Sequence, residues 1–503
     1  MSAGKQLGLS FPTSAKAEDA NKPALTFGVE LEYIFATRID QLDEKSLHIT
    51  DRDAIAVDVV RKAVQEKLQA KCKLCGQDVA FDLRLFDGRR HDTEAQAIAD
   101  ALRALGDRSF QEQSPDAFTS WEVVTEGVAA KAAELTALGK DEQMYFFNGC
   151  EIKSRVLSRA EDLVVPDEGA DHDHKITCEQ EIRAVLQKLT QRFCLFDPEE
   201  DRADYLFPNE NCALHVHVGQ QSDGFELQTV KELLCLNLAC EGQIDQMHAV
   251  NRITGGDFGI KPLSGSYPHY NPYVSGIEGT LVNGASRIDE TAKNIPLSYP
   301  FGQGAYRRQQ QALDIIKPKL YQSESGYYPD SYFDSIPGLR QLTMRNDIDA
   351  RLTVIEYAPT LHSLHALYGH RPRSTTLNIS NLMHQADIET VEYRQHASTM
   401  SADAILAWVD VVLNMTSYCR DTSREDLQVL VGSDGSLRKA GTSHLDLLKA
   451  VGCAPETVDH YTRRECDKYQ RSLRHAEANS AQAASKDPLA SLTLVSIALS
   501  VCN

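Results

Sequence analysis

The chain has 503 residues, 42% of them hydrophobic and 25% charged, a composition typical of globular proteins rather than of disordered or fibrous chains. Asp and Glu outnumber Lys and Arg by 72 to 52, which leaves a formal net charge of -20. Such a charge repels nucleic acid phosphates and anionic membrane surfaces, so neither a nucleic acid nor a membrane is expected as a partner.

The sequence also lacks the marks of export. Residues Met1–Asn21 contain no apolar core of signal-peptide length, and no stretch reaches the ~18 apolar residues of a membrane span. A cytoplasmic location is therefore expected, with the nucleus left open. The 12 cysteines are then expected to be reduced.

The predicted elements begin after a polar segment. Residues 1–24 are predicted to form a flexible N-terminal arm, which a strand over Leu25–Ala36 follows. A second strand is predicted over Leu214–Gly219. Apolar residues recur at helical spacing in four segments, which are Ala54–Ala70, Glu94–Leu105, Cys178–Phe193 and Leu227–Val250.

The composition changes between Gly255 and about Asp334, where Gly, Pro, Ser and Tyr dominate. A structureless stretch of this length is unusual inside a compact domain. Two interpretations remain open: an insertion or lid beside an active site, and a surface excursion with no part in function.

Regular elements resume after this segment. Strands are predicted over Val354–Tyr357 and Glu389–His396. A strongly periodic helix is predicted over Ala402–Tyr418, with Ser401 or Thr399 as its N-cap. Two shorter helices are predicted over Leu445–Val451 and Glu456–Ala476.

Polar side chains alternate with apolar ones on the predicted strands. The alternation places Glu30 and Glu32 on one face of the first strand, and His215 and His217 on one face of the second. A solvated sheet face explains the glutamates equally well, and a hydrogen-bonded structural pair explains the histidines. Neither motif decides the matter alone.

Two further strands carry the same pattern. Glu392, Arg394 and His396 alternate with apolar residues on one strand, and Glu151 alternates with Cys150 and Ile152 on another, Phe147–Lys153. If these strands pair in one sheet, their four carboxylates converge, and they cannot all stay ionised in a partly buried site without cations. Oxygen ligands favour Mg²⁺, and a histidine ligand leaves room for Mn²⁺.

The ordered set of these strands resembles the amidoligase family, which is similar to the glutamine synthetase and γ-glutamylcysteine ligase group of carboxylate–amine ligases. The segments that carry the resemblance are Gly28–Glu32, Gly149–Ser154, Leu214–Gly219 and Glu392–Thr399. The resemblance implies an α+β fold, with a curved antiparallel β-sheet and helices on one face, as in a glutamine synthetase-like catalytic fold. It assigns residues 25–420 to an amidoligase-like catalytic domain with a loop-rich insertion at about 255–334, and leaves 421–503 as a helical C-terminal extension.

The resemblance also implies residue roles. His217 would contact the substrate, Arg394 would hold the transferring phosphoryl group of ATP, and Arg252 would match a further arginine of the nucleotide site. The metal ligands would be Glu30, Glu32, Glu151, His215 and Glu392. Two positions depart from the family pattern: Glu126 stands where an aspartate is expected, and Arg155 stands where a proline usually follows the serine.

The implied reaction transfers the γ-phosphoryl group of ATP to a carboxylate, giving an acyl phosphate that an amine then attacks. Glu392, His396 or a carboxylate of the lid would take the proton of the amine. The carboxylate and amine belong to small molecules or peptides that the sequence does not name, and the oligomeric state is equally hidden. No P-loop motif occurs, so ATP follows from the resemblance alone.

Two alternatives remain open on the same residues. A metal-dependent amide hydrolase would use the carboxylates and histidines but would need no nucleotide. A catalytically inactive binding protein would keep the fold without the reaction.

Cysteines and histidines elsewhere form weaker patterns. Cys72-x-x-Cys75 resembles half of a zinc knuckle, but no second such pair follows and only His91 lies nearby in sequence. A pair of reduced thiols at a helix end is therefore predicted. The segment Asp171–His174 is predicted to be a solvated turn, with metal binding as the alternative.

Overall fold

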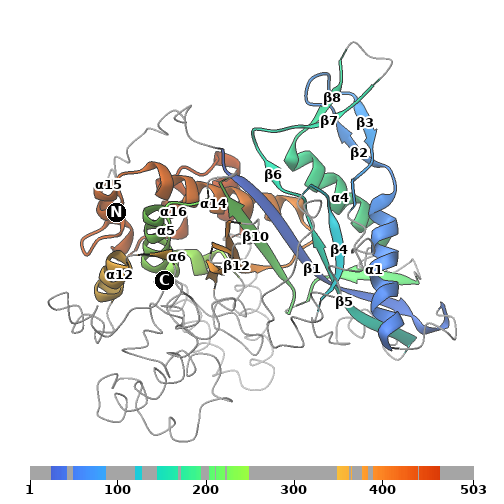
Figure 1. The fold of residues 1–503 in the computed structure, drawn as a ribbon, viewed down its shortest axis with the longest axis horizontal. Helices are drawn as coiled ribbons and strands as arrows, with labels where there is room; N and C mark the ends of the chain where they lie inside the picture. Colours follow the sequence, from blue (N-terminus) through green and yellow to red (C-terminus); the bar gives the residue numbers. More distant parts are fainter. Residues whose placement is uncertain are drawn as a thin grey trace, which may run out of the picture.

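The computed structural model combines helices with an antiparallel sheet, so the expected α+β class is confirmed (Figure 1). The residues that the structure describes are 24–41, 49–85, 119–126, 144–167, 172–193, 203–209, 211–220, 224–248, 348–358, 360–361, 364, 376–382, 389–439 and 441–464. Arg252, the helix expected over Glu94–Leu105, the insertion at about 255–334 and residues 1–23 of the predicted arm lie outside them.

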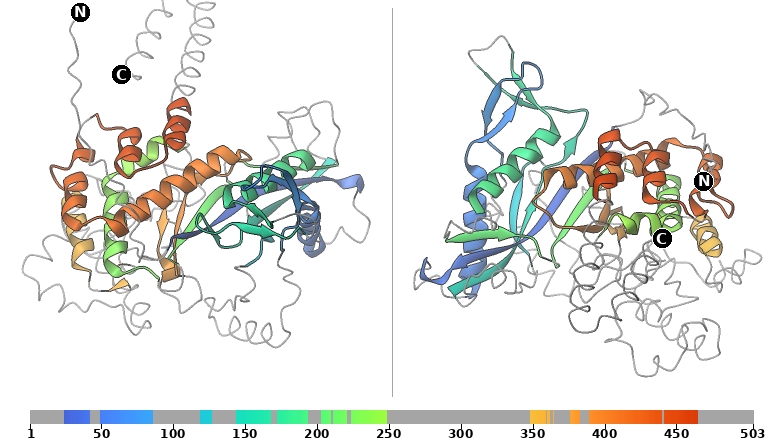
Figure 2. Two further views of the ribbon diagram at one scale, coloured as in Figure 1. Left: turned by 90° about the horizontal axis from the view of Figure 1, so that it is seen from above. Right: turned by 180° about the vertical axis from the view of Figure 1, so that it is seen from behind.

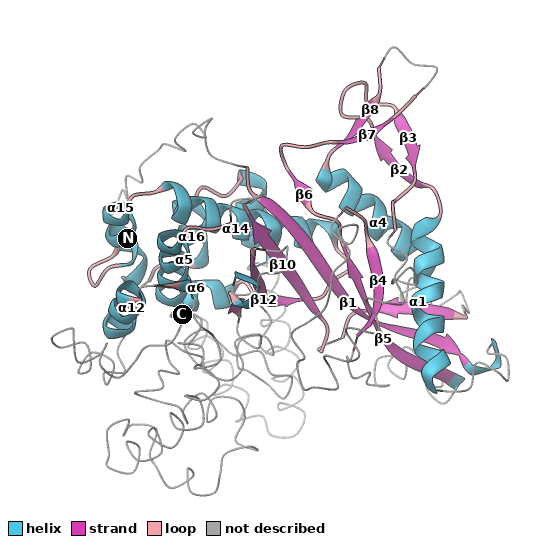
Figure 3. Ribbon diagram, viewed as in Figure 1, coloured by secondary structure: helices cyan, strands magenta, loops and turns pink. Residues whose placement is uncertain are grey.

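The main sheet has eight strands in the order β11-β12-β10-β1-β5-β4, with β6 and β9 pairing with β1 outside this path. All its ladders are antiparallel, and among the described residues the sheet stays open between β11 and β4. Figure 3 shows β1 as the long central strand, flanked by β10 and β5. The strands are β1 Thr26–Arg38, β4 Glu122–Glu126, β5 Tyr145–Lys153, β6 Leu157–Ser158, β9 Asp204–Phe207, β10 Ala213–Gly219, β11 Leu377–Asn378 and β12 Thr390–Ala397.

Helices and two small hairpins accompany this sheet. The α-helices are α1 Ile49–Gln65, α4 Cys178–Phe193, α5 Leu227–Ala239, α6 Glu241–Gln246, α12 Ile348–Tyr357, α14 Ala402–Asp421, α15 Arg424–Val431 and α16 His444–Ala450, and residues 455–464 are also helical. The 3-10 helices are η1 Ile39–Gln41, η9 Ser380–Leu382 and η10 Ser436–Arg438. The hairpins pair β2 Leu68–Lys71 with β3 Asp78–Phe81, and β7 Leu163–Val165 with β8 His174–Ile176.

One large hydrophobic core lies between the sheet and the helices. Phe27, Val29 and Leu31 of β1 are at most 2% exposed and belong to the same buried cluster as the apolar faces of α4, α5 and α14. Figure 2 shows α14 and α4 running along one side of the strands. Because strand residues alternate between faces, burying these side chains turns Glu30 and Glu32 to the other side of the sheet.

The other face of β1 changes character along the strand. Beyond the glutamates, Ile34 and Ala36 enter a second, smaller apolar cluster with Tyr205 and Phe207 of β9 and with Cys212. The polar surface is therefore restricted to the first half of β1, where β10 and β5 flank it.

The predicted helix Cys178–Phe193 is confirmed in full, and Ser401 is the N-cap of α14. The Ser401 side-chain oxygen accepts a hydrogen bond from the Ala404 N–H at 3.3 Å, which satisfies one of the free donors of the first turn. Thr399 stabilises the N-cap itself, because its Oγ1 accepts a hydrogen bond from the Ser401 N–H at 3.1 Å.

Three predicted elements differ from the structure. The helix expected over Ala54–Ala70 ends at Gln65, because Leu68–Lys71 pairs with β3 instead. The helix expected over Leu227–Val250 breaks at Cys240 into α5 and α6. The prediction of a strand over Val354–Tyr357 was wrong, since these residues end helix α12. A short apolar run does not distinguish a strand from a buried helical segment.

An ion pair joins Arg155, which follows β5, to Glu181 of α4. The Arg155 guanidinium donates from Nε and Nη2 to the Glu181 carboxylate at 3.0 and 2.7 Å. The Trp121 indole N–H donates to the same carboxylate at 2.7 Å. Glu181 is only 1% exposed, so these donors offset the cost of burying its charge.

The C-terminal helices share the main core. Buried side chains of α15, α16 and the helical residues 455–464 belong to the same apolar cluster as the sheet. Among the helices in the described parts of the chain, none is both long and apolar enough to cross a membrane.

Candidate metal centre on the polar face of the sheet

Strand register brings the predicted ligands together on four adjacent strands. Glu30 of β1 lies opposite His215 of β10, and Glu32 of β1 lies opposite Glu151 of β5. Glu392 of β12 lies opposite His217 of β10. Directly opposed residues on neighbouring strands have Cβ atoms about 4.5–5.5 Å apart, so the register alone places their side chains within contact distance.

His215 occupies the centre of this group and is 3% exposed. Its Nδ1 lies 3.2 Å from the Glu30 carboxylate and 3.6 Å from the Glu392 carboxylate. Its Nε2 lies 3.6 Å from the Glu32 carboxylate. The two ring nitrogens therefore face different carboxylates, and one imidazole connects both halves of the site.

His217 lies nearer to solvent on the same strand, with 18% of its side chain exposed. Its Nε2 is 3.3 Å from Glu30 and 3.9 Å from Glu392. Its Nδ1 is 3.2 Å from the Thr390 hydroxyl and 3.4 Å from the Asn381 side-chain amide. The ring is thus held between two carboxylates on one edge and two polar side chains on the other.

The Glu392 carboxylate has a different partner on each oxygen. The Asn378 side-chain amide donates to Oε2 at 2.6 Å, and Arg394 Nη1 donates to Oε1. Glu392 is 4% exposed, whereas a quarter of the Arg394 side chain is accessible to solvent. Arg394 is therefore the more exposed partner of this ion pair.

Lys153 supplies a second cation at the other end of the site. Its Nζ lies 3.0 Å from Glu151 and 3.5 Å from Glu30. Glu32 is held separately, because its Oε2 accepts a hydrogen bond from the Ala213 backbone N–H at 2.7 Å.

The carboxylates differ in their affinity for protons. Burial raises the pKa of Glu32 and raises that of Glu151 well above its usual range, where the Glu30 charge adds to the effect. Burial is also the largest single influence on Glu30 and Glu392, but their cationic neighbours together outweigh it, His217, His215 and Lys153 for Glu30 and Arg394, His217 and His215 for Glu392, so both pKa values are lowered. Burial and mutual repulsion therefore disfavour the ionised form of Glu32 and Glu151, and added cations would favour it.

The donor set fits divalent cations. Glu30, His215 and Glu392 each offer a ligand atom within 4.8 Å of the others, and so do Glu32, Glu151 and His215. Carboxylate oxygens dominate both groups, which favours Mg²⁺ or Mn²⁺ over softer metals. A neutral imidazole has one free lone pair, so only one of the two groups takes the His215 nitrogen as a ligand.

His396 does not join this site. The pairing of β10 with β12 shifts between Leu214 and Val216, so that His396 lies opposite Leu214 while Tyr393 lies opposite Val216. A bulge of this kind turns the residues beyond it to the other face of the sheet. His396 is 3% exposed and packs against Trp408, with ring centroids 5.8 Å apart. The prediction that it shares the catalytic face with Glu392 was wrong.

Two residues of the site were missed by the sequence reasoning. Lys153 shares a face with Glu151 by strand alternation, so the pattern contained that signal. Asn378 comes from the two-residue strand β11, and no sequence pattern marked it.

Glu126 lies on β4 in register with Gly149, and its charge contributes to the raised pKa values of Glu32 and Glu151.

Of the other predicted site residues, the structure brings Glu30, Glu32, Glu151, His215, His217, Glu392 and Arg394 into one cluster. Arg252 lies outside the described residues. Comparisons of the chain with protein-family models, with curated proteins and with solved structures found no match.

Proposed function

We propose that this protein is an ATP-dependent carboxylate–amine ligase that works with Mg²⁺, or with Mn²⁺ in its place. The observation that supports this best is the pair of metal-ligand groups that share His215, with the cations Arg394 and Lys153 at either end. The order of the strand motifs resembles the amidoligase family, and the glutamine synthetase-like fold remains part of the proposal.

Phosphoryl transfer requires positioning and charge stabilisation rather than covalent help from the protein. When bound, divalent cations would neutralise charge on the phosphates of ATP. Glu30, Glu32, Glu151, Glu392 and His215 would hold these cations. Four of the five are buried, and contacts among neighbouring side chains keep the ligand atoms in place before any substrate arrives.

Arg394 is proposed to hold the transferring phosphoryl group. Its guanidinium is anchored on Glu392 and remains partly exposed, so the planar group can present N–H donors to phosphate oxygens. Lys153 at the far end of the cluster offers a second positive charge, and Glu30 and Glu151 hold its pKa above the usual range despite burial.

His217 is proposed to bind the carboxylate substrate. Burial lowers the pKa of this imidazole, but the charge and hydrogen bond of Glu30 and the charge of Glu392 together outweigh burial and raise the pKa overall. A protonated ring attracts an anion, and His217 is more exposed than His215.

The amine is proposed to attack the acyl phosphate, forming the C–N bond and releasing inorganic phosphate as the C–O bond breaks. The nitrogen becomes strongly acidic as it bonds to the acyl carbon, so a weak base suffices to take its proton. Glu392 fits that part. His396 does not, because it packs among the helices on the other side of the sheet.

The test uses hydroxylamine as the amine and a panel of amino acids as carboxylates. A ligase converts these to hydroxamates only when ATP and Mg²⁺ are both present, with one phosphate released for each hydroxamate. A Glu32→Gln/Glu392→Gln variant is expected to lose both products, whereas Glu456→Gln, which changes an exposed glutamate, is expected to retain them.

The alternatives give different results in the same assay. Release of an amine from amide substrates without nucleotide would replace the proposal with a metal-dependent hydrolase. Absence of both reactions, together with Mg²⁺ binding and no nucleotide binding, would replace it with a non-catalytic binding protein.

A further inference from the structure

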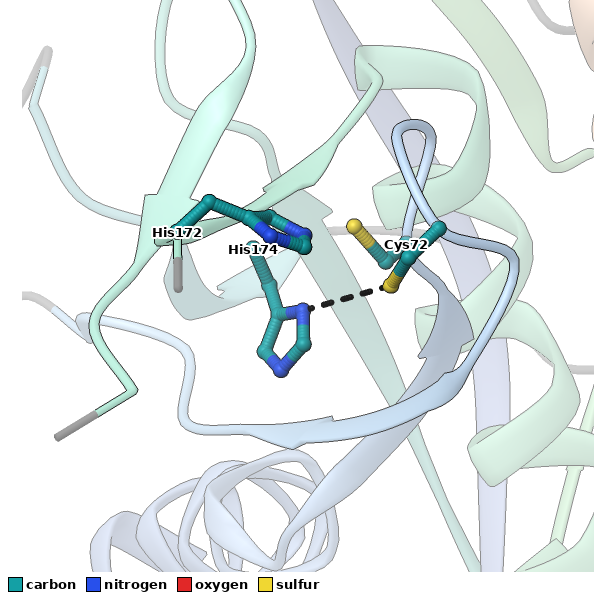
Figure 4. Close-up of side chains that lie close together, drawn as sticks. Cys72, His172 and His174 are labelled. Carbon is teal, nitrogen blue, oxygen red and sulfur yellow. Dashed lines mark hydrogen bonds between the residues drawn. The ribbon is translucent and has the colours of Figure 1, made fainter. Parts of the chain in front are cut away.

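A second group of metal-type ligands lies away from the polar face, where the two small hairpins meet. Cys72 and Cys75 belong to the turn between β2 and β3, and His172 and His174 lie at the start of β8. One ligand atom from each of the four lies within 4.8 Å of the other three. In Figure 4, Cys72 and both imidazoles point toward a common centre.

These residues contradict two predictions from the sequence. The cysteines lie in a hairpin turn rather than at a helix end, and His174 is 7% exposed rather than part of a solvated turn. The two pairs are far apart in sequence, so only the packing of the hairpins brings them together. One direct link is the Lys73 N–H, which donates to the Lys175 carbonyl at 2.7 Å.

The turn that carries the cysteines is shaped around the Cys72 sulfur. The Gly76 N–H donates to the Cys72 carbonyl at 2.8 Å, and Gly76 adopts φ +74°, which costs a glycine little. The Leu74 N–H points at Cys72 Sγ at 3.4 Å. A backbone N–H directed at sulfur stabilises a thiolate, which is the form that binds metal.

The two ring nitrogens of His174 have separate partners. Its Nδ1 faces the Cys75 sulfur at 3.8 Å, and its Nε2 lies 3.0 Å from the Asp167 carboxylate. A histidine that ligates a metal commonly bonds its other ring nitrogen to a carboxylate, which fixes the tautomer and raises the basicity of the ligand. Asp167 therefore leaves Nδ1 available to the centre of the cluster.

The electrostatics agree with this geometry. Burial disfavours the charged form of Cys72, but hydrogen bonds from backbone N–H groups, that of Cys75 foremost, and from His174 outweigh it and lower the pKa to about 5. The hydrogen bond with Cys72 raises the pKa of His174 in turn.

We propose that Cys72, Cys75, His172 and His174 bind a structural zinc ion that joins the β2–β3 hairpin to the β7–β8 hairpin. Two sulfur and two nitrogen ligands match tetrahedral Zn²⁺. Tetrahedral zinc at its usual bond lengths separates ligand atoms by about 3.3–3.8 Å, and the four ligand atoms, all within 4.8 Å of one another, need at most a small contraction to reach that spacing. Four protein ligands leave no position for a substrate, so the ion serves stability and is independent of the proposed ligase activity.

The test measures zinc in the full-length protein purified without added metal, and then the spectrum after exchange of zinc for Co²⁺. Wild type is expected to retain one zinc ion after dialysis against Mg²⁺ buffer. Co²⁺ is expected to show the intense visible bands of a tetrahedral ion and the near-ultraviolet band of thiolate ligation. A Glu32→Gln/Glu151→Gln variant is expected to keep those bands, which separates this ion from the polar-face centre.

Matched variants identify the ligands. Cys75→Ser and His172→Ala, both at exposed positions, are expected to fold with an unchanged circular dichroism spectrum and to lose the tightly bound zinc. Cys453→Ser, which changes a half-buried cysteine elsewhere, is expected to retain it. Asp167→Asn is expected to weaken zinc affinity by about 10- to 100-fold.

Three results would overturn the proposal. They are zinc content that is equal in Cys75→Ser and wild type, a Co²⁺ spectrum without thiolate bands, and a disulfide between Cys72 and Cys75 in the protein purified from the cell.

Discussion

Arg394 and Lys153 lie at the two ends of a row of carboxylates that spans four strands, from β12 to β5. Each cation contacts a glutamate that is almost fully buried, and each remains partly exposed itself. The two positive charges therefore lie nearer to solvent than the buried carboxylates that they contact. A phosphate chain with bound cations has the matching alternation of charge, which is the residue-scale basis of the proposed function.

Replacing Arg394 by Gln is expected to lower kcat by about 10³-fold, the smaller of the effects measured when a phosphate-contacting arginine is lost. Arg394→Lys is expected to recover only part of this, because an ammonium lacks the planar pair of donors. Steady-state turnover of ATP measures both. Equal activity of Arg394→Gln and the exposed control Arg463→Gln would remove Arg394 from the site.

The bulge in β12 places Glu392 and His396 on opposite faces of the sheet. Glu392 and His396 are separated by an even number of positions, so regular alternation predicts that they share a face. The extra residue in β12 changes that relation, and His396 packs against Trp408 of α14 instead. A bulge leaves little trace in composition, which is why the sequence pattern could not predict the outcome.

Changing His396 to Gln is therefore expected to reduce stability by about 1–2 kcal/mol through lost packing and to leave kcat unchanged. Urea unfolding and turnover measured on the same variant separate the two effects. A fall in kcat comparable with that of Glu392→Gln, at unchanged stability, would contradict the assigned face.

The Arg155–Glu181 pair stabilises the junction of β5 with α4. Arg155→Ala is expected to cost about 3 kcal/mol, because it leaves the buried Glu181 carboxylate without its main cation. Arg183→Ala breaks the exposed pair with Asp403 instead and is expected to cost no more than about 1 kcal/mol. Similar urea midpoints for the two variants would show that the buried pair stabilises the fold no more than the exposed pair does.

Across the whole molecule, local sequence patterns predicted most residues of the polar-face site but not all of them. Strand alternation identified Glu30, Glu32, His215 and His217, because burial of one face forces the intervening residues to the other. Asn378 came from a two-residue strand whose pairing is set by the tertiary fold. The Cys72 cluster depended on the packing of two hairpins distant in sequence, which no local pattern encodes.

The charge of the metal-free molecule has a consequence for its pH stability. Glu32, Glu151 and His217 have raised pKa values, so each stabilises the fold at pH below its ordinary pKa and loses that contribution as pH rises through the raised value. Glu30 and Glu392 have lowered values, and their contributions are complete above about pH 5.5. The melting temperature of metal-free protein is therefore expected to fall as pH rises above about 6.

Saturating Mg²⁺ is expected to reduce this fall, because the cation favours the deprotonated ligands. Differential scanning fluorimetry at a series of pH values, with and without Mg²⁺, measures the melting temperature. The Glu32→Gln/Glu151→Gln variant lacks two of the titrating groups, so its melting temperature is expected to change less with pH. A metal-free melting temperature that rises over the same range would contradict the assigned pKa directions.

The proposed function requires the polar face of the sheet to bind ATP through divalent cations. Its most direct test is thermal stabilisation of the wild-type protein by a non-hydrolysable ATP analogue, with and without Mg²⁺. At about 100 times the dissociation constant, binding is expected to add about 2.7 kcal/mol of stability. The gain should require Mg²⁺ and should vanish in the Glu30→Ala/Glu392→Ala variant, whereas no response of wild type at saturating analogue and Mg²⁺ would contradict the claim.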